Sequence, residues 1–228
     1  MTSVPDRQAK ITELRHAIRA DYTATADTTG LNTPGRAVLT AIGNVPRDRF
    51  VPPSETSRAW ENAALPIGHG QTISQPFIVA LMTDLLALQP GARVLEIGTG
   101  CGYQTAILAE LSDDVYSIEV IPELARKARE RLDALGYTRV NTRTGDGCAG
   151  WPEAAPFDGI IVTAGAPRVP ARLVEQLAAG GRLVIPVNTD RGAQTLMVGV
   201  KKESGKLETR WILAVRFVPL VDPDGGAG

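Results

Sequence analysis

From residue 92 onward, apolar segments of strand length alternate along the chain with segments whose apolar residues recur at helical spacing. Nearly continuous apolar runs such as ARVLEI and GRLVIPV are typical of strands buried in a parallel sheet. The expected strands are ARVLEI, DVYSIEV, RVNTRT, FDGIIVT and GRLVIPV, and the expected helices cover YQTAILAEL, residues 122–135 and residues near 170–179. This alternation predicts an α/β fold with a doubly wound, mostly parallel, seven-stranded sheet. Its last two strands, AQTLMVGVKK and KLETRWILAVRFVPL, are expected to form an antiparallel hairpin across the turn ESG.

The first 90 residues follow a different pattern. Ile11, Leu14 and Ile18 recur at helical spacing and predict a short amphipathic helix over residues 6–20. The threonine-rich residues 23–33, followed by Pro34 and Gly35, predict a loop or mobile linker, because clusters of threonine, glycine and proline are typical of loops. Further helices are expected over residues 36–43 and over FIVALMTDLLAL, the second ending at Pro90 and Gly91.

These patterns divide the chain into three parts. Residues 1–90 are predicted to form an N-terminal helical extension that carries a polar loop at residues 65–76. Residues 91–221 are predicted to form a cofactor-binding, Rossmann-like domain, and residues 222–228 a flexible tail.

Composition narrows the class of protein. The chain has 228 residues, 43% of them hydrophobic, and a formal net charge of −1. A balanced charge gives no reason to expect a nucleic-acid partner. Two cysteines are too few for a disulfide framework or a zinc site. Since no signal peptide or membrane span is apparent, we expect a soluble, cytoplasmic protein that contacts no membrane.

A glycine-rich turn stands between the first predicted strand and its helix. Gly98, Gly100 and Gly102 in LEIGTGCGYQ permit a tight turn and a close approach of the backbone to a ligand. A dinucleotide-binding turn would carry glycine or alanine where Tyr103 stands. Glu96, just ahead, would repel a pyrophosphate and suits a cationic ligand. S-adenosylmethionine is therefore the favoured cofactor, and a nicotinamide or flavin cofactor is the alternative.

Two further acids end the next two predicted strands. Glu119 lies 21 residues after Gly98, close to the spacing at which an acid reaches ribose hydroxyls in this architecture. Asp146, followed by Gly147, would reach the adenine from the third strand. The alternative for Glu119 is a solvated acid ahead of the helix that begins at residue 122. The alternative for Asp146 is an ordinary Asp-Gly turn.

The polar loop LPIGHGQTISQP, residues 65–76, lies between two prolines ahead of a predicted helix. A serine in the position of Ser74 often caps the backbone amides of the following helix. Residue types alone therefore leave Ser74 open to either a structural or a chemical role.

Several segments together resemble the protein-L-isoaspartate O-methyltransferase family. They are LPIGHGQTISQP, VLEIGTGCGYQTAILAEL, GDG, PFDGIIVTAGAP and AVRFVPLV, in this order between residues 36 and 221. The glycine turn and the acids are common to many methyltransferases, whereas GQTISQP before the fold and RFVPL behind it are specific to this family.

The resemblance implies a fold, an activity and partners. The fold would be that of class I S-adenosylmethionine-dependent methyltransferases. The enzyme would methylate the free carboxylate of L-isoaspartyl residues, and in this family also D-aspartyl residues, in damaged proteins. Methylation would start repair through a succinimide. No metal would be required, and the enzyme would act as a monomer on isoaspartyl-containing proteins or peptides.

The resemblance also implies roles for individual residues. Ser74 would hold the acceptor carboxylate, with Gln71 and Thr72 along the cofactor wall. Val218 and Pro219 would line the peptide cleft. A carboxylate with a pKa of about 4 is already ionised at neutral pH, so no general base is needed. His69 is therefore expected to be an ordinary loop residue.

Two alternatives are retained at this stage. The same scaffold could methylate normal aspartates of one dedicated peptide during natural-product maturation. The second alternative is a non-catalytic module that binds S-adenosylmethionine. Loss of the residues of the glycine turn or of the polar loop would favour it.

Overall fold

The structure is a computed structural model that describes residues 4–189 and 192–220, so the predicted tail 222–228 lies outside the described residues. The α-helices are α1 (Val4–Thr29), α2 (Arg36–Asn44), α3 (Pro76–Leu86), α4 (Tyr103–Ala109), α5 (Pro122–Ala134) and α6 (Ala171–Gln176). The strands are β1 (Leu65–Gly68), β2 (Gln71–Ile73), β3 (Arg93–Ile97), β4 (Asp114–Glu119), β5 (Asn141–Thr144), β6 (Phe157–Val162), β7 (Leu177–Asn188), β8 (Gln194–Lys201) and β9 (Leu207–Val215). Short 3-10 helices cover η1 (Arg47–Arg49), η2 (Pro53–Arg58), η3 (Gly147–Ala149) and η4 (Pro152–Ala154).

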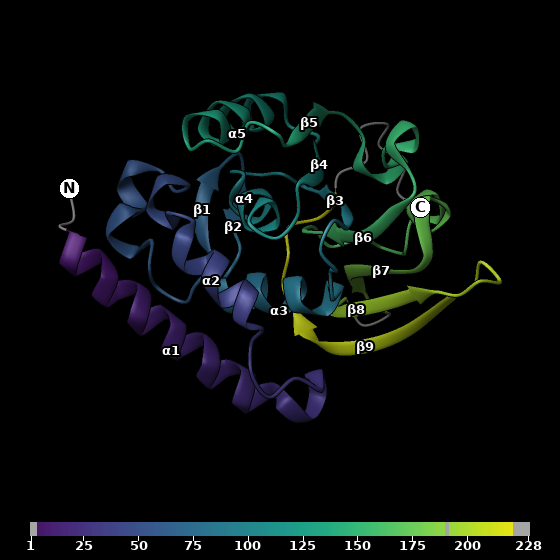
Figure 1. Ribbon diagram of the computed structural model, residues 1–228, viewed down its shortest axis with the longest axis horizontal. Coiled ribbons are helices and arrows are strands. Elements are labelled where there is room, and N and C mark those ends of the chain that lie inside the picture. Colours follow the sequence, from purple (N-terminus) through teal and green to yellow (C-terminus); the bar gives the residue numbers. More distant parts are fainter. Residues whose placement is uncertain (1–3, 190–191, 221–228) are drawn as a thin grey trace.

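The central sheet has seven strands in the order β5-β4-β3-β6-β7-β8-β9 (Figure 1). The pairs from β5 to β7 are parallel, whereas β7–β8 and β8–β9 are antiparallel. The predicted fold class, with its C-terminal antiparallel strands, is confirmed. The strand order reverses direction between β3 and β6, and ligands of such sheets bind at this switch point, beyond the carboxyl ends of the strands.

The sheet is buried on both faces because successive strand residues enter different hydrophobic clusters. Val94 packs in a cluster with side chains from α1 to α4, whereas its neighbour Leu95 packs in a second cluster that includes Leu173 of α6. The first cluster contains residues of both the N-terminal helices and the sheet, so the helical extension shares its core with the cofactor-binding part.

The predicted linker over residues 23–33 is wrong for most of its length, because α1 continues to Thr29. Three threonine hydroxyls donate hydrogen bonds to the carbonyl one turn earlier, from Thr23 to Arg19, from Thr25 to Asp21 and from Thr29 to Thr25. This bonding satisfies the hydroxyls without breaking the helix.

Tertiary contacts hold this part of α1 against the protein. Tyr22 is fully buried, packs edge-on against Phe77 at 5.6 Å between ring centroids, and donates to Asp84 at 2.6 Å. Arg210 of β9 donates to the carbonyl of Thr29 at the helix end. Packing of the apolar face therefore outweighs the weak helix propensity of threonine.

Two predicted boundaries also move. The helix over FIVALMTDLLAL begins at Pro76 but ends at Leu86, where Ala87 takes a left-handed conformation with φ of 49°. The helix near residues 170–179 ends at Gln176, and β7 begins at Leu177 beside β6. Within the described ranges, no helix combines the length and apolar character needed to cross a bilayer.

Candidate active site

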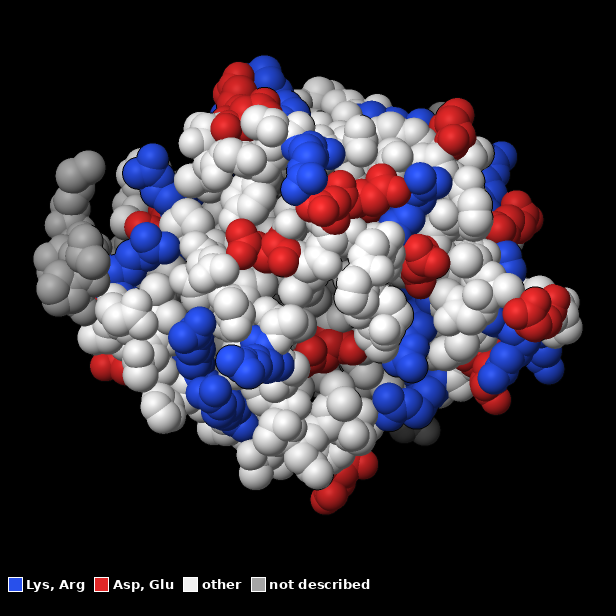
Figure 2. Space-filling model, viewed as in Figure 1, with Lys and Arg blue, Asp and Glu red and all other residues white. Residues whose placement is uncertain are grey.

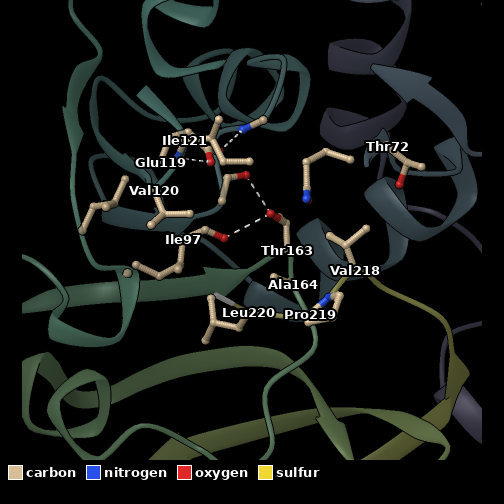
Figure 3. A pocket seen from close by; sticks show the side chains of 15 residues that line it. Thr72, Ile97, Glu119, Val120, Ile121, Thr163, Ala164, Val218, Pro219 and Leu220 are labelled. Carbon is tan, nitrogen blue, oxygen red and sulfur yellow. Dashed lines mark hydrogen bonds between the residues drawn. The ribbon is translucent and has the colours of Figure 1, made fainter. Parts of the chain in front are cut away.

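A cavity lies at the switch point, beyond the ends of β3, β4 and β6 (Figure 3). It is lined by Gln71, Thr72, Ile97, Gly98, Gly100, Ile118, Glu119, Val120, Ile121, Gly147, Thr163, Ala164, Val218, Pro219 and Leu220. The structure thus brings together residues that five separate segments of the sequence had proposed. We call this space the cofactor cavity.

The glycine turn forms one side of the cofactor cavity. Gly98 has φ of 97°, and a Cβ at this position would lie 2.4 Å from Oγ1 of Thr163, so a larger residue is excluded on two grounds. Gly102 lies outside the cavity lining, at the start of α4, where its φ of 90° and its closeness to Leu132 and Ala128 serve packing.

Glu119 occupies the end of β4 and lines the cofactor cavity, as the sequence predicted for a ribose ligand. Its side chain accepts the backbone N–H of Gly100 at 2.7 Å and that of Ile121 at 3.0 Å. This carboxylate therefore fixes the glycine turn relative to β4. Glu119 is only 5% exposed, yet it lines the cavity.

Glu96 lies below the turn, fully buried and outside the cavity lining. Its Oε2 accepts the hydroxyls of Thr105 and Ser117, while Oε1 has no hydrogen-bond partner among the described residues. Burial raises the pKa of Glu96 to about 8, so the side chain is largely neutral at pH 7. The expected attraction between an anionic Glu96 and a cationic cofactor finds no support in this geometry.

Asp146 and Gly147 follow β5. Gly147 lines the cofactor cavity, and a Cβ there would lie 2.3 Å from Ile97, so the backbone passes close to β3. The Asp146 side chain accepts the N–H of Cys148 at 2.7 Å and starts the short helix η3. Its contact with adenine stays a prediction.

The sequence analysis did not select Thr163, although this residue follows β6 at the same edge of the sheet. Its hydroxyl donates to the carbonyls of Gly98 at 2.7 Å and Ile97 at 3.0 Å (Figure 3). The signal that could have found it is its position, because it ends the strand FDGIIV beside the glycine turn.

The polar loop 65–76 contains a small antiparallel hairpin, β1–β2, rather than an irregular loop. His69 and Gly70 form its turn with φ of 53° and 70°, the positive values of a type I′ hairpin. Nε2 of His69 lies 3.2 Å from Oε2 of Glu123, so the tip of the hairpin contacts the start of α5. Gln71 and Thr72 line that cavity as predicted.

A larger cleft of about 600 Å³ opens beside the hairpin, between α1 and β9. Its walls include Asp21 and Thr25 of α1, Ser74, and the segment 213–217 at the end of β9. We call it the acceptor cleft. Val218 and Pro219 line the cofactor cavity, and their expected contact with a peptide stays a prediction.

Ser74 borders both the acceptor cleft and a small pocket of about 40 Å³. That small pocket is also lined by Gly98, Gly100 and Thr163, which face the cofactor cavity. Ser74 therefore stands where the two larger spaces approach each other.

Helix capping does not occupy the Ser74 hydroxyl. The N-cap position of α3 belongs to Gln75, and the N–H of Phe77 is satisfied by Oδ1 of Asn62 at 3.0 Å. No described residue forms a hydrogen bond with the hydroxyl of Ser74, whereas its carbonyl accepts from Arg47.

Comparison with known proteins identifies similar chains. Residues 27–225 match the family described as protein-L-isoaspartate(D-aspartate) O-methyltransferase. The protein-L-isoaspartate O-methyltransferase 2 of Polaromonas sp. strain JS666 is 53% identical over 192 residues, or 84% of this chain and 91% of that protein.

Solved structures show the same likeness. One protein-L-isoaspartate O-methyltransferase has a TM-score of 0.77 at 29% identity, covering 90% of this chain and 66% of that one. A Plasmodium falciparum β-aspartate methyltransferase structure, in complex with S-adenosyl-L-homocysteine, has a TM-score of 0.74 at 23% identity. It covers 91% of this chain and 98% of that one, and at this identity it supports the fold alone.

Proposed function

Because the chain belongs to the protein-L-isoaspartate(D-aspartate) O-methyltransferase family, we infer that it methylates the free carboxylate of L-isoaspartyl residues in proteins. The methyl donor is S-adenosylmethionine, and the methyl ester starts repair through a succinimide. The observation that carries the assignment of the site is the place of Ser74, between the cofactor cavity and the acceptor cleft.

The residues of the cofactor cavity fit this donor. Glu119 can accept hydrogen bonds from ribose hydroxyls, and the glycine turn lets the backbone approach the ligand closely. Gly147 lines the cavity without a side chain, because a Cβ there would collide with Ile97. S-adenosylmethionine supplies a methyl group on a positively charged sulfur, which makes that group electrophilic.

The acceptor needs orientation rather than activation. An isoaspartyl carboxylate is ionised at neutral pH, since its ordinary pKa is about 4, and it is already a nucleophile. We propose that the Ser74 hydroxyl donates a hydrogen bond to one carboxylate oxygen and holds the other toward the cofactor cavity. His69 is not needed as a base and instead contacts Glu123.

Exclusion of water is the second contribution of the protein. The transfer neutralises an anion and a cation, so a site screened from water favours it. Thr72 and the hairpin cover one side of the cofactor cavity, and Val218 and Pro219 cover another (Figure 3).

The acceptor cleft suits an extended peptide. Among the described strands, β9 stands at the end of the sheet, so its outer backbone groups are paired with no other described strand. We propose that a peptide lies along residues 213–217 and pairs with the outer groups of the end of β9, as peptides do on other exposed sheet edges. The backbone groups of Phe217 are already bonded to the side chain of Gln194. The segment leads directly to Val218 and Pro219 at the cofactor cavity.

Charge and association complete the proposal. Acidic and basic side chains occur in small groups of both signs over the face drawn in Figure 2, in keeping with the net charge of −1. We propose a monomeric, cytoplasmic enzyme that acts on proteins and not on nucleic acids or membranes.

A pair of matched peptides tests the function. The two peptides share one sequence and differ only in an aspartyl or isoaspartyl linkage, which moves the carboxylate by one backbone methylene. We expect methyl transfer to the isoaspartyl peptide and none to its twin. Equal rates on both peptides would contradict damage repair and favour a dedicated aspartyl peptide, and no transfer to any peptide would favour a cofactor-binding module.

A further inference from the structure

A fully buried arginine joins three segments around the proposed acceptor site. Arg47, in η1, donates to the carbonyls of Ala59 at 2.8 Å, Ala63 at 2.9 Å and Ser74 at 3.0 Å. Its guanidinium group therefore joins residues far apart in the sequence. One of its partners is the backbone carbonyl of Ser74, the residue proposed to hold the acceptor carboxylate.

This cation has unusual surroundings. Its hydrogen bonds go to neutral carbonyls, no described acid forms an ion pair with it, and burial lowers its pKa. A buried charge without a counter-ion costs considerable free energy, even when it is hydrogen-bonded. Three planar N–H donors pointing in fixed directions are what a guanidinium supplies and an ammonium does not.

An aromatic ring completes the surroundings of Arg47. Its guanidinium lies over the ring of Tyr103, 5.0 Å from the ring centroid, within the range of a cation–π contact. Tyr103 is the first residue of α4, directly after the glycine turn, and it lines the same small space as Ser74. Arg47 thus contacts the polar loop through a hydrogen bond to Ser74, and it contacts the start of α4, next to the glycine turn, through the ring of Tyr103.

The contacts continue to the other side of the glycine turn. Phe50 packs edge-on against Tyr103 at 5.5 Å, and Arg131 of α5 lies over Phe50 at 5.8 Å. Arg131 also donates to the carbonyl of Cys101 within the turn at 2.6 Å. Two arginines and two rings therefore form one continuous stack from the backbone of Ser74 to the backbone of the glycine turn.

We propose that Arg47 is a positioning residue, which sets the distance between the Ser74 hydroxyl and the cofactor cavity by clamping the Ser74 carbonyl against Tyr103. The inference rests on the proposed role of Ser74. It concerns the rate of methyl transfer and not the binding of the cofactor, because Arg47 is absent from the lining of the cofactor cavity.

The test is a double-mutant cycle between R47K and S74A. Lysine keeps the positive charge but cannot donate to all three carbonyls in the fixed directions of a guanidinium. The polar loop at Ser74 is then no longer held in one place. Misplacement of a reacting group by about 1 Å costs on the order of 10²-fold in rate. We expect kcat of R47K, at saturating peptide and cofactor, to fall by about 10- to 100-fold. The KM for the peptide and the Kd for S-adenosylhomocysteine should change less than about threefold.

The double variant decides between positioning and general damage. If Arg47 acts through Ser74, the kcat of R47K/S74A will lie within about threefold of that of S74A alone, since coupled residues are not additive. R93K is the matched control. Arg93 also donates to a carbonyl, that of Ala154, and lies over the ring of Tyr116. Unlike Arg47 it pairs with Asp114, and it begins β3, at the end of the strand away from the cofactor cavity. We expect R93K to leave kcat unchanged.

Several results would overturn the proposal. An unchanged kcat for R47K, or losses that multiply in the double variant, would reduce Arg47 to a structural residue. Normal turnover by S74A alone would instead refute the proposed role of Ser74, so the two failures are distinguishable. If R47K does not fold, Y103L carries the same cycle with S74A, because it removes the ring while keeping the carbonyl hydrogen bonds of Arg47. Multiplying losses in that cycle would count equally against the proposal.

Discussion

The buried carboxyl of Glu96 makes a quantitative prediction about stability. Its pKa is about 8 in the folded protein, because burial disfavours the charged form, against 4.5 as the ordinary value. Between these values the folded chain holds a proton that the unfolded chain has released. The contribution of Glu96 to the free energy of unfolding is therefore fully present below pH 4.5 and decreases as the pH rises toward 8.

The substitution E96Q removes this dependence, since an amide is neutral at every pH and can still accept from Thr105 and Ser117. One proton per molecule corresponds to about 1.4 kcal/mol per pH unit. The free energy of unfolding of the natural chain, relative to that of E96Q, should thus fall by roughly 2.5 kcal/mol between pH 5 and pH 7. Urea denaturation at pH 5, 6 and 7 measures it.

A control and a second measurement sharpen the experiment. E130Q removes an exposed acid on α5 that pairs with Arg126, and its pH profile should parallel that of the natural chain. Binding of S-adenosylhomocysteine by E96Q should stay within about threefold, because Glu96 does not line the cofactor cavity. Parallel unfolding profiles for E96Q and the natural chain would show that Glu96 is ionised in the fold, with its two hydroxyl donors outweighing the effect of burial. A large loss of affinity would restore the direct contact expected from sequence.

Three other predictions follow from single contacts. S74A should fold and bind S-adenosylhomocysteine but lose on the order of 10²-fold in kcat, about 3 kcal/mol, because one oriented donor is gone; thermal melts beside single-turnover methylation measure this, and normal turnover per folded molecule would refute it. E119A should weaken cofactor binding by about 1–3 kcal/mol, as removal of one partner from buried polar groups does, and calorimetry with unchanged affinity would contradict the ribose contact. Y22F should lower the free energy of unfolding by about 1–3 kcal/mol, since Asp84 loses a buried donor; an unchanged midpoint in urea would show that this contact adds nothing.

The sheet and the glycine turn were predictable because their signals are local. Apolar runs of strand length identify buried parallel strands whatever their neighbours, and strand ends in a parallel sheet meet at one edge. Glu119 could be placed at the cofactor cavity by this rule alone. Thr163 could have been placed in the same way, since it follows β6 at that edge.

The errors arise where contacts between distant segments decide. Residues 23–29 remain helical because Tyr22 packs on Phe77 and Arg210 holds the end of α1, and neither contact is visible in the local sequence. Glu96 was expected to be an anion beside a cationic cofactor, whereas its protonation state depends on complete burial under the turn. Arg47 lies in an ordinary-looking VPRDRF segment, and its importance depends on three carbonyls supplied by other segments.

The hairpin β1–β2 belongs to two binding sites at once. Gln71 and Thr72 form part of the cofactor wall, and Ser74, just beyond β2, borders the acceptor cleft. Any movement of the hairpin that opens the cofactor cavity, beginning with separation of the exposed His69 from Glu123, also displaces the residue proposed to hold the peptide. The short hairpin therefore ties the geometry of the two sites together, since Thr72 on the cofactor wall and Ser74 at the acceptor cleft are only two residues apart.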